Sequence, residues 1–255
     1  MDADILEYYD RGGEDRRILD SVELLRTKVL LRRHLPDNAE ILDVGGASGA
    51  HATWLTGDGH RVRIVDPVPR HVATARARGI DAVEGDARAL AEPDGSRDAV
   101  LLLGPLYHLL DRADRVRALA EARRVSRDLV IAAVISRWAP LWDGLLGGAV
   151  DVPGFTPMLR EDLDTGVRRG TQHVPHGFTT CYFHRPEEIA AEVADAGLTL
   201  VDLVPVEGMA QWIPDLADRL ADPGKRAVLL ELLERTEREP AILGATSHLL
   251  AVARR

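Results

Sequence analysis

The sequence predicts an α/β fold: a doubly wound, mostly parallel sheet of seven strands, with an N-terminal helical lead-in and a cap inserted after the fifth strand. Three observations predict it. Between residues 40 and 135, short β-rich apolar runs alternate with longer Ala- and Arg-rich helical stretches, which is typical of a parallel sheet covered by helices. Two further strand-like runs follow residue 184 and extend the sheet. Residues 136–184, rich in Gly, Pro, Trp and His, interrupt the alternation.

The first five predicted strands occupy residues 41–44, 62–65, 82–84, 99–103 and 129–134. Right-handed crossovers place the carboxyl ends of these strands along one edge of the sheet, where ligands bind in such folds. The last two predicted strands are residues 200–204 and 248–253. Residues 136–184 begin where the fifth strand ends, so we expect them to form an irregular cap above the ligand edge.

Helix signals flank the central alternation. In the lead-in, Gly12-Gly13 breaks the chain before a helix expected over residues 21–34. Its apolar side would carry Leu24, Leu25, Val29 and Leu31.

Two more helices are expected near the C-terminus. The first opens with Pro186-Glu187-Glu188 and ends at Gly197, with proline in the first turn and glycine as the cap. The second starts at Asp222-Pro223. It carries two i,i+4 pairs in the favourable order, Glu231/Arg235 and Glu234/Arg238.

Composition and charge exclude several kinds of partner. The 255 residues are 45% hydrophobic and carry a net charge of −9, and the basic residues are scattered. We therefore expect neither nucleic acid nor a membrane as partner. The one cysteine, Cys181, cannot form an internal disulfide, and the acidic N-terminus has no basic leader. These features predict a cytoplasmic protein, either a monomer or a homodimer.

A glycine-rich segment follows the first predicted strand. Ile41-Leu42-Asp43-Val44 runs into Gly45-Gly46-Ala47-Ser48-Gly49, and a helix is expected from Ala50. Such a turn lets backbone N–H groups at a helix N-terminus approach a ligand closely. The alternative interpretation is a tight turn that binds nothing.

Two acidic residues follow the next strands. Asp66 ends the second strand, 21 positions after Gly45, at the spacing from which a carboxylate reaches ribose hydroxyls. Asp86 follows the third strand in Gly85-Asp86-Ala87, where it would accept a hydrogen bond from an adenine amine. Together with the glycine-rich turn they predict an adenosine pocket. Each acid could instead serve as a helix N-cap.

These segments resemble class I S-adenosylmethionine-dependent methyltransferases. ILDVGGASG is similar to their glycine-rich motif, RIVDP to their ribose-binding motif and GDA to their adenine motif. LLLGPLYHLLDRADRVRALAEARRV resembles the fourth-strand motif of a bacterial group that acts on small molecules, and YYDRGGEDRR and EREPAILGATSHLLAVARR fit its two ends. Two departures occur: Ala47 replaces the middle glycine of GxGxG, and Ser126-Arg127-Asp128 replaces Lys-Pro-Gly-Gly.

The resemblance implies a Rossmann-like methyltransferase fold over residues 1–255, with a flap and helix (1–38), a cofactor-binding core (39–135), a substrate cap (136–184) and a C-terminal part of the sheet (185–255). It implies S-adenosylmethionine as cofactor and S-adenosylhomocysteine as product. The implied cofactor-binding residues are Asp43, Gly45, Gly46, Ala47, Gly49, Asp66, Pro67, Asp86, Ala87, Leu103 and Gly104.

Two other classes of function compete with this one. In a nicotinamide-dependent oxidoreductase, the fingerprint GxGxxG would read Gly45-x-Ala47-x-x-Ala50, which fits poorly. A non-catalytic protein that binds an adenosine ligand would need the same pocket and no acceptor.

The segment after the fourth strand supplies the catalytic candidate. Gly104-Pro105-Leu106-Tyr107-His108 would lie beside the sulfonium, and a histidine has a pKa suited to taking a proton from an acceptor. We expect His108 to be a general base, the alternative being a helix cap or a packing residue. By family resemblance, Tyr9 would close over the site from the flap.

Aromatic residues predict where the acceptor binds. Of eleven Phe, Trp and Tyr residues, only Trp54 lies between residues 40 and 104. The substrate candidates are Tyr8, Tyr107, Trp138, Trp142, Phe178 and Glu239, although the cap aromatics could form the cap's own core and Glu239 could be a solvated acid. We expect N- or C-methylation of an aromatic amine or indole-type specialised metabolite, with O-methylation of a small aromatic metabolite as alternative.

Four potential metal ligands, His173, His176, Cys181 and His184, fall within twelve residues. Structural zinc sites usually join two short pairs across a longer loop than these four residues provide. We expect no metal.

Overall fold

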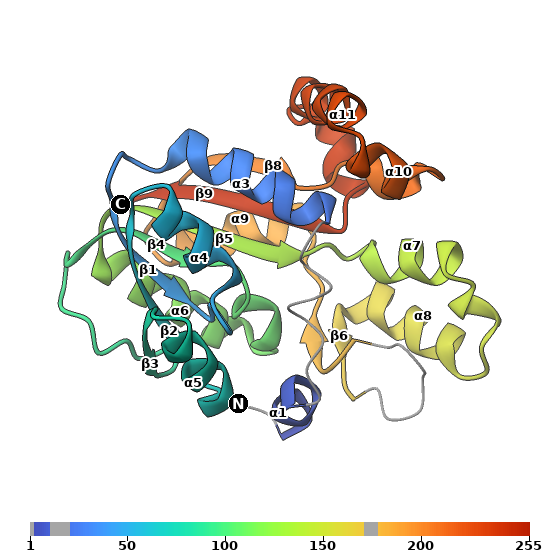
Figure 1. Cartoon of the computed structure of the whole chain (residues 1–255). Coiled ribbons are helices and arrows are strands. Elements are labelled where there is room, and N and C mark those ends of the chain that lie inside the picture. The colour runs from blue at the N-terminus through green and yellow to red at the C-terminus, as the bar shows by residue number, and fades with distance from the viewer. Residues whose placement is uncertain (1–2, 11–20, 171–177) are drawn as a thin grey trace.

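The computed structural model describes residues 3–10, 21–170 and 178–255. Its main sheet has seven strands in the order β3-β2-β1-β4-β5-β9-β8 (Figure 1). Their bounds are β1 Glu40–Val44, β2 Arg61–Asp66, β3 Asp81–Glu84, β4 Arg97–Leu102, β5 Ser126–Ile135, β8 Thr199–Pro205 and β9 His248–Arg254. All seven predicted strands and the fold class are confirmed.

The strand order creates the ligand edge. β1 pairs in parallel with both β2 and β4, so the chain reverses its winding direction between these two neighbours. Ligands bind at such switch points, beyond the carboxyl ends of the strands. β9 runs antiparallel to β5 and β8, so the amino end of β9 lies at the same edge as the carboxyl end of β5.

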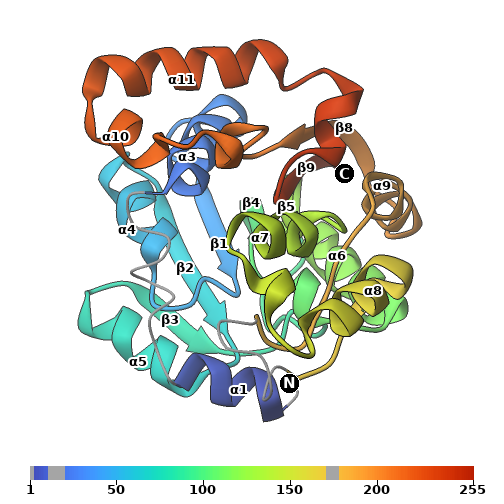
Figure 2. The ribbon, with the colours of Figure 1, turned by 90° about the vertical axis from the view of Figure 1, so that its right-hand side faces the viewer.

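Helices cover both faces of the sheet (Figure 2). On one face lie α3 Val22–His34, α4 Ala50–Gly57 and α5 Pro69–Ala77; on the other lie α6 Arg112–Val125 and α9 Pro186–Asp195. The division follows the period of two along each strand: in β1, Ile41 packs on the α3 side, whereas Leu42 packs on the α6 side. The other helices near the C-terminus are α10 Leu216–Ala221 and α11 Pro223–Thr236.

The N-terminal helix signal is confirmed where the structure describes it. Ser21 caps α3, its Oγ accepting a hydrogen bond from Leu24 N–H at 3.0 Å. Leu24 and Leu31 are buried as predicted, while Leu25 and Val29 are only half-buried. The break at Gly12-Gly13 lies outside the described residues.

The cap is more regular than expected. It contains α7 Ala139–Leu146, η2 Ala149–Asp151, α8 Phe155–Thr165 and a small ribbon of β6 Val167–Arg168 with β7 Cys181–Tyr182. Phe155, Leu159 and Leu163 repeat every four residues along α8, and this apolar side packs against α7 and η2. The prediction of an irregular segment was therefore wrong.

One of the two predicted surface pairs on α11 forms. Arg235 Nε donates to Glu231 at 2.9 Å. Glu234 and Arg238 do not pair, because α11 ends at Thr236; Arg238 contacts Asp202 instead. Among the described residues, no helix is long and apolar enough to cross a membrane.

Short helices complete the chain. They are α1 Ala3–Asp10, η1 Leu106–His108, η3 Ala210–Trp212 and η4 Pro240–Gly244. α1 lies across the ligand edge, where the backbone carbonyl of Asp4 accepts a hydrogen bond from Thr179 of the cap at 3.2 Å.

Candidate active site

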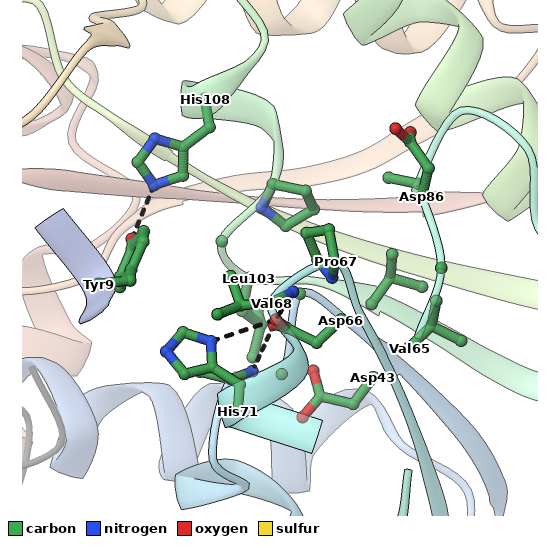
Figure 3. Close-up of a pocket in the computed structure, with 18 of the residues that line it drawn as sticks. Tyr9, Asp43, Val65, Asp66, Pro67, Val68, His71, Asp86, Leu103 and His108 are labelled. Carbon is green, nitrogen blue, oxygen red and sulfur yellow. Dashed lines mark hydrogen bonds and ion pairs between the residues drawn. The ribbon is translucent and has the colours of Figure 1, made fainter. Parts of the chain in front are cut away.

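A pocket opens at the carboxyl ends of β1, β2, β3 and β4 (Figure 3). Of the eleven residues predicted for the cofactor, ten line it: Asp43, Gly45, Gly46, Ala47, Asp66, Pro67, Asp86, Ala87, Leu103 and Gly104. Gly49 is not among the lining residues. It is the N-cap of α4, with a φ of 91° that favours glycine.

Tight packing explains the small residues of the loop. A Cβ at Gly46 would lie 2.6 Å from Oδ2 of Asp43, and one at Gly45 would lie 2.9 Å from Cδ of Pro105. Ala47 has a φ of 48°, in the left-handed region that a glycine adopts more readily. Its N–H donates to Asp66 Oδ2 at 2.9 Å, which fixes the loop to the end of β2.

Asp66 organises the pocket floor. Besides Ala47, its carboxylate accepts hydrogen bonds from Val68 N–H at 2.9 Å and is 3.1 Å from His71 Nδ1. The side chain is buried, and these contacts occupy three of roughly four lone-pair positions that a carboxylate offers. One acceptor position therefore remains on Oδ2.

Asp43 is a buried acid without a partner among the described residues. Both of its carboxylate oxygens are buried and accept no hydrogen bond there. Burial, with a smaller contribution from the charge of Asp66, raises the pKa of Asp43 to about 7. An orphaned carboxylate under a glycine-rich loop is what a ligand rich in hydrogen-bond donors would satisfy.

Asp86 lies at the other side of the pocket, paired with Arg88. Its Oδ1 accepts from the backbone N–H and Nε of Arg88, both at 2.9 Å, and its Oδ2 accepts from Nη2 at 2.7 Å. These hydrogen bonds hold the pKa of Asp86 below its ordinary value. As in Asp66, one acceptor position remains on Oδ2.

His108 and Tyr9 lie next to each other at one side of the pocket (Figure 3). Tyr9 Oη lies 2.7 Å from His108 Nε2, and His108 Nδ1 lies 3.2 Å from the carbonyl oxygen of Thr180. Desolvation lowers the pKa of His108 to about 4, so the ring is neutral near pH 7. This pKa is below the ordinary value for a histidine, because the ring lies among apolar and aromatic side chains.

An aromatic group surrounds His108. The ring centroid of His108 lies 4.7 Å from that of Tyr107 and 5.6 Å from that of Phe178. Tyr8 contacts Phe178 at 5.4 Å between centroids. Three predicted substrate residues thus gather beside the pocket.

The other three substrate candidates lie elsewhere. Trp138 stacks near the guanidinium of Arg185 at 5.2 Å, and Trp142 packs on Trp212 with centroids 4.8 Å apart. Glu239 is exposed at the start of η4. None of the three lines the pocket, because the cap aromatics pack with their own surroundings and the acid faces solvent.

The possible metal ligands of the cap are only partly described. Cys181 is buried in a small apolar cluster with Ile135 and Phe183, and burial raises the pKa of its thiol. His184 Nε2 lies 3.2 Å from Glu192 Oε2. Both residues therefore have structural surroundings, while His173 and His176 lie outside the described residues.

Three further pocket residues were not predicted from the sequence. His51 lies in the first turn of α4, and burial lowers its pKa to about 4. Glu23 comes from the first turn of α3, and His71 from α5. His51 and His71 follow the glycine-rich segment and the RIVDP segment by two and four residues, so those motifs could have indicated them; no motif lies near Glu23, and only the packing of α3 at the sheet edge reveals it.

Comparisons with known proteins agree with this geometry. Residues 41–128 match the family model described as a methyltransferase domain. Over 232 residues the chain is 28% identical to a ubiquinone biosynthesis O-methyltransferase of Methylocella silvestris, covering 79% of this chain and 84% of that protein.

Two solved structures share the fold. One is an S-adenosylmethionine-dependent methyltransferase from Thermotoga maritima, described as a possible histamine N-methyltransferase; its TM-score is 0.59 at 19% identity, over 98% of this chain and 96% of that one. The other is the CcbJ methyltransferase from Streptomyces caelestis, with a TM-score of 0.59 at 16% identity, over 98% of this chain and 95% of that one.

Proposed function

We propose that the chain, an S-adenosylmethionine-dependent methyltransferase, methylates nitrogen or carbon of an aromatic amine or indole-type specialised metabolite. The observation that carries this proposal is one pocket that joins a glycine-rich loop and two strand-end acids to the rings of Tyr9, Tyr107 and His108, with Phe178 packed beside Tyr107 and His108.

We propose that the cofactor lies along the ends of β1 to β3. Asp66 would accept from a ribose hydroxyl and Asp86 from the adenine amine, each through its remaining acceptor position. The orphaned carboxylate of Asp43 would accept from donor groups of the same molecule. When bound, S-adenosylmethionine supplies a methyl group on a sulfonium.

The acceptor would lie against the rings of Tyr8, Tyr107 and Phe178. Flat aromatic walls favour a flat, largely apolar molecule, and ring faces also attract a cationic amine. Tyr9 and His108 would cover the reacting atoms and exclude water, which a direct displacement requires.

O-methylation is the second candidate, and the sequence relative favours it. That relative is named for an O-methyltransferase reaction, whereas one structural neighbour is described through an N-methyltransferase reaction. The two candidates need the same pocket and differ only in the acceptor atom.

A direct assay tests the proposal. The purified protein is incubated with S-adenosylmethionine and matched pairs of indoles, aromatic amines and phenols, and products are analysed by mass spectrometry for the gain of one methyl group. Methylation of amines or indoles supports the first candidate, and methylation of phenols alone supports the second. Binding of S-adenosylhomocysteine in calorimetry without turnover on any acceptor would favour a non-catalytic ligand-binding protein.

We further propose that residues 1–255 act as one methyltransferase domain, with residues 136–184 as its substrate cap. The cap leaves the sheet at the end of β5 and returns at α9, next to the pocket edge (Figure 1). A structure with S-adenosylhomocysteine and an acceptor would test whether the cap contacts the acceptor.

A further inference from the structure

His51 is a pocket residue whose ring proton can be assigned. It lies in the first turn of α4, directly after the glycine-rich loop, and lines the pocket. Trp54 Nε1 donates a hydrogen bond to His51 Nδ1 at 3.4 Å. An indole N–H only donates, so Nδ1 is the accepting nitrogen. Because burial lowers the pKa of His51 to about 4, the ring is neutral near pH 7 and its one proton is on Nε2.

The Nε2–H group of His51 is available to a ligand. It makes no hydrogen bond with any residue that the structure describes. It is also absent from the fully buried polar atoms of those residues that lack a partner, so it is accessible from the pocket that His51 lines. A polar donor in the wall of a pocket fixes the orientation of a ligand that offers an oxygen atom.

The start of α4 favours a negatively charged group at the same place. Its N-cap is Gly49, which has no side chain to accept hydrogen bonds from the first turn. Ala47 and Ala50 line the pocket together with His51, so this end of the helix borders the pocket. The N-terminus of a helix carries a partial positive charge. The His51 donor and the helix end therefore both favour a carboxylate.

The position of His51 along the pocket indicates which part of the cofactor it meets. Asp86 and Asp66 follow β3 and β2, where we place adenine and ribose, and the glycine-rich loop follows β1, the next strand of the sheet. The remainder of S-adenosylmethionine is its amino-acid end, which would extend over this loop towards α4. The acceptor wall of Tyr107 and Phe178 belongs instead to η1 and the cap.

An amino-acid end carries a carboxylate and an ammonium group on one carbon atom, so its site needs a donor and an acceptor together. Asp43 provides the acceptor. It lies beneath the loop, it lines the pocket, and both of its buried oxygens lack a partner among the described residues.

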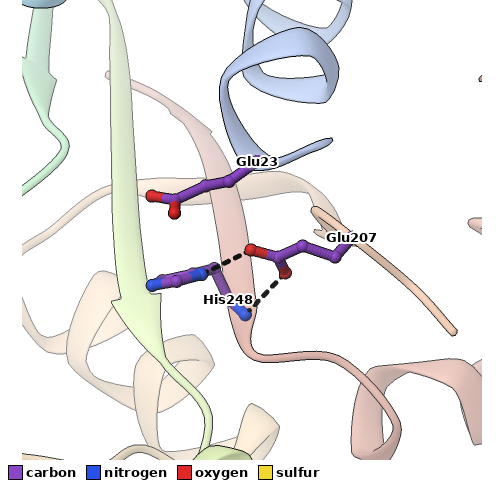
Figure 4. Close-up of side chains that lie close together, drawn as sticks. All are labelled: Glu23, Glu207 and His248. Atoms are coloured by element: carbon purple, nitrogen blue, oxygen red, sulfur yellow. Dashed lines mark hydrogen bonds and ion pairs between the residues drawn. The ribbon is translucent and has the colours of Figure 1, made fainter. Parts of the chain in front are cut away.

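Glu23 is the other acid near His51, but it has a different environment. Its carboxylate belongs to a group with Glu207 and His248, in which one oxygen or nitrogen atom of each side chain lies within 4.8 Å of the others (Figure 4). Glu207 is already bound to His248 Nδ1 at 2.5 Å, and Glu23 has further interactions of its own. We therefore assign no ligand contact to Glu23.

We propose that His51 makes the cofactor site specific for a ligand with a free carboxylate: its Nε2–H group donates to the carboxylate of the amino-acid end, whose ammonium group lies towards Asp43. This inference rests on the proposed position of the cofactor along β1 to β3 and does not depend on the acceptor. His51 acts by binding and orienting the cofactor, and no bond to the ring forms or breaks.

Calorimetry with two ligands tests the assignment. The ligands are S-adenosylhomocysteine and its decarboxylated analogue, which keeps the amine and lacks only the carboxylate. The wild-type protein should bind S-adenosylhomocysteine roughly 10- to 100-fold more tightly, the contribution of a hydrogen bond to a charged group. In His51→Phe this preference should disappear, because the affinity for S-adenosylhomocysteine falls by that factor while the affinity for the analogue stays unchanged.

Two further variants separate this effect from general damage to the pocket. His51→Gln keeps an N–H donor and should keep most of the preference. His71→Phe changes another pocket histidine, 3.1 Å from Asp66 at the ribose end. Any loss of affinity in His71→Phe should be equal for the two ligands, so its preference should remain that of the wild type.

NMR on the wild-type protein decides the question if His51→Phe does not fold. The Nε2–H signal of His51 should shift downfield when S-adenosylhomocysteine is added and should not do so with the decarboxylated analogue.

Three results would overturn the inference: equal affinities of the wild type for the two ligands, an unchanged preference in His51→Phe, or an equal loss of both affinities in that variant. If the wild type binds neither ligand, the cofactor site and the role of His51 fail together. If it binds S-adenosylhomocysteine with the expected preference but methylates no small acceptor, the proposed function alone fails.

Discussion

Tyr9 and His108, 99 positions apart in the chain, are joined by a hydrogen bond of 2.7 Å between the phenol oxygen and Nε2. A carbonyl oxygen only accepts, so the contact of His108 Nδ1 with Thr180 assigns the ring proton to Nδ1. The neutral ring then accepts the phenol proton at Nε2. This bond links α1 to the end of β4 and closes one side of the pocket.

The Tyr9–His108 bond predicts coupled effects on catalysis. Tyr9→Phe removes one neutral hydrogen bond of roughly 0.5–1.5 kcal/mol, so kcat/KM should fall by up to about tenfold. His108→Gln should have an effect of similar size and leave the affinity for S-adenosylhomocysteine unchanged, because the ring faces Tyr9 rather than the floor of the pocket. In a double-mutant cycle the two losses should not add. Full additivity would show that the bond plays no part in turnover.

Asp66 should control cofactor affinity. Asp66→Ala removes the acceptor for Ala47 N–H and for a ribose hydroxyl. Hydrogen bonds to a charged group contribute roughly 1.5–3 kcal/mol, so calorimetry should show S-adenosylmethionine binding weakened tenfold or more. Asp81→Ala on the neighbouring strand is the control, because that exposed acid pairs only with Arg63 in the part of the chain described and lies outside the pocket. Equal affinities of the two variants would contradict the pocket assignment. If NADH bound with micromolar affinity and S-adenosylmethionine did not bind, the nicotinamide-dependent oxidoreductase would be favoured instead.

Asp43 should make the stability of the ligand-free protein depend on pH. Burial raises the pKa of its carboxyl to about 7 in the folded state, whereas the unfolded chain has the ordinary value, so between these values the folded protein holds an extra proton. That contribution to stability is present at low pH and is lost as pH rises towards and through 7. Each pKa unit corresponds to roughly 1.4 kcal/mol, so the total is of the order of a few kcal/mol.

Asp43→Asn removes this titration. The fall in melting temperature between pH 5 and pH 8 should therefore be smaller in Asp43→Asn than in the wild type, and the variant should be the more stable protein at pH 8. The comparison uses differential scanning calorimetry without ligand. If the melting temperatures of the two proteins change with pH by the same amount across this range, Asp43 is ionised throughout.

The parts of the molecule predictable from sequence are those built by local signals. The glycine-rich loop and Asp66 each follow directly from a strand, so the known geometry of parallel strands already brings them together. Glu23 and His248 meet through α3 packing and the antiparallel insertion of β9, and nothing near either residue in the sequence indicates the other. For Trp142, the sequence shows an aromatic-rich segment but not the residue on which the ring packs. That residue is Trp212, and tertiary structure alone brings the two together.

A buried ion pair anchors the return of the cap to the sheet. Arg115 of α6 donates from Nε and Nη2 to Glu192 Oε1 of α9 at 2.9 and 2.7 Å, and His184 lies 3.2 Å from the other oxygen of the same carboxylate. The guanidinium also lies 3.7 Å from the ring centroid of Tyr182 in β7. Glu192 thus joins two helices to the end of the cap.

Removing this carboxylate should destabilise the protein strongly. Glu192→Ala leaves the Arg115 charge buried and without its carboxylate, which typically costs about 3–5 kcal/mol of unfolding free energy. The same two helices offer a matched control: Arg112 and Asp195 also form an ion pair, but both side chains are more than half exposed, so Asp195→Ala should change stability by less than about 1 kcal/mol. Urea unfolding followed by circular dichroism measures both. If the two variants lose the same stability, the buried pair contributes no more than a surface pair, and the cap must be held to the sheet by its apolar contacts.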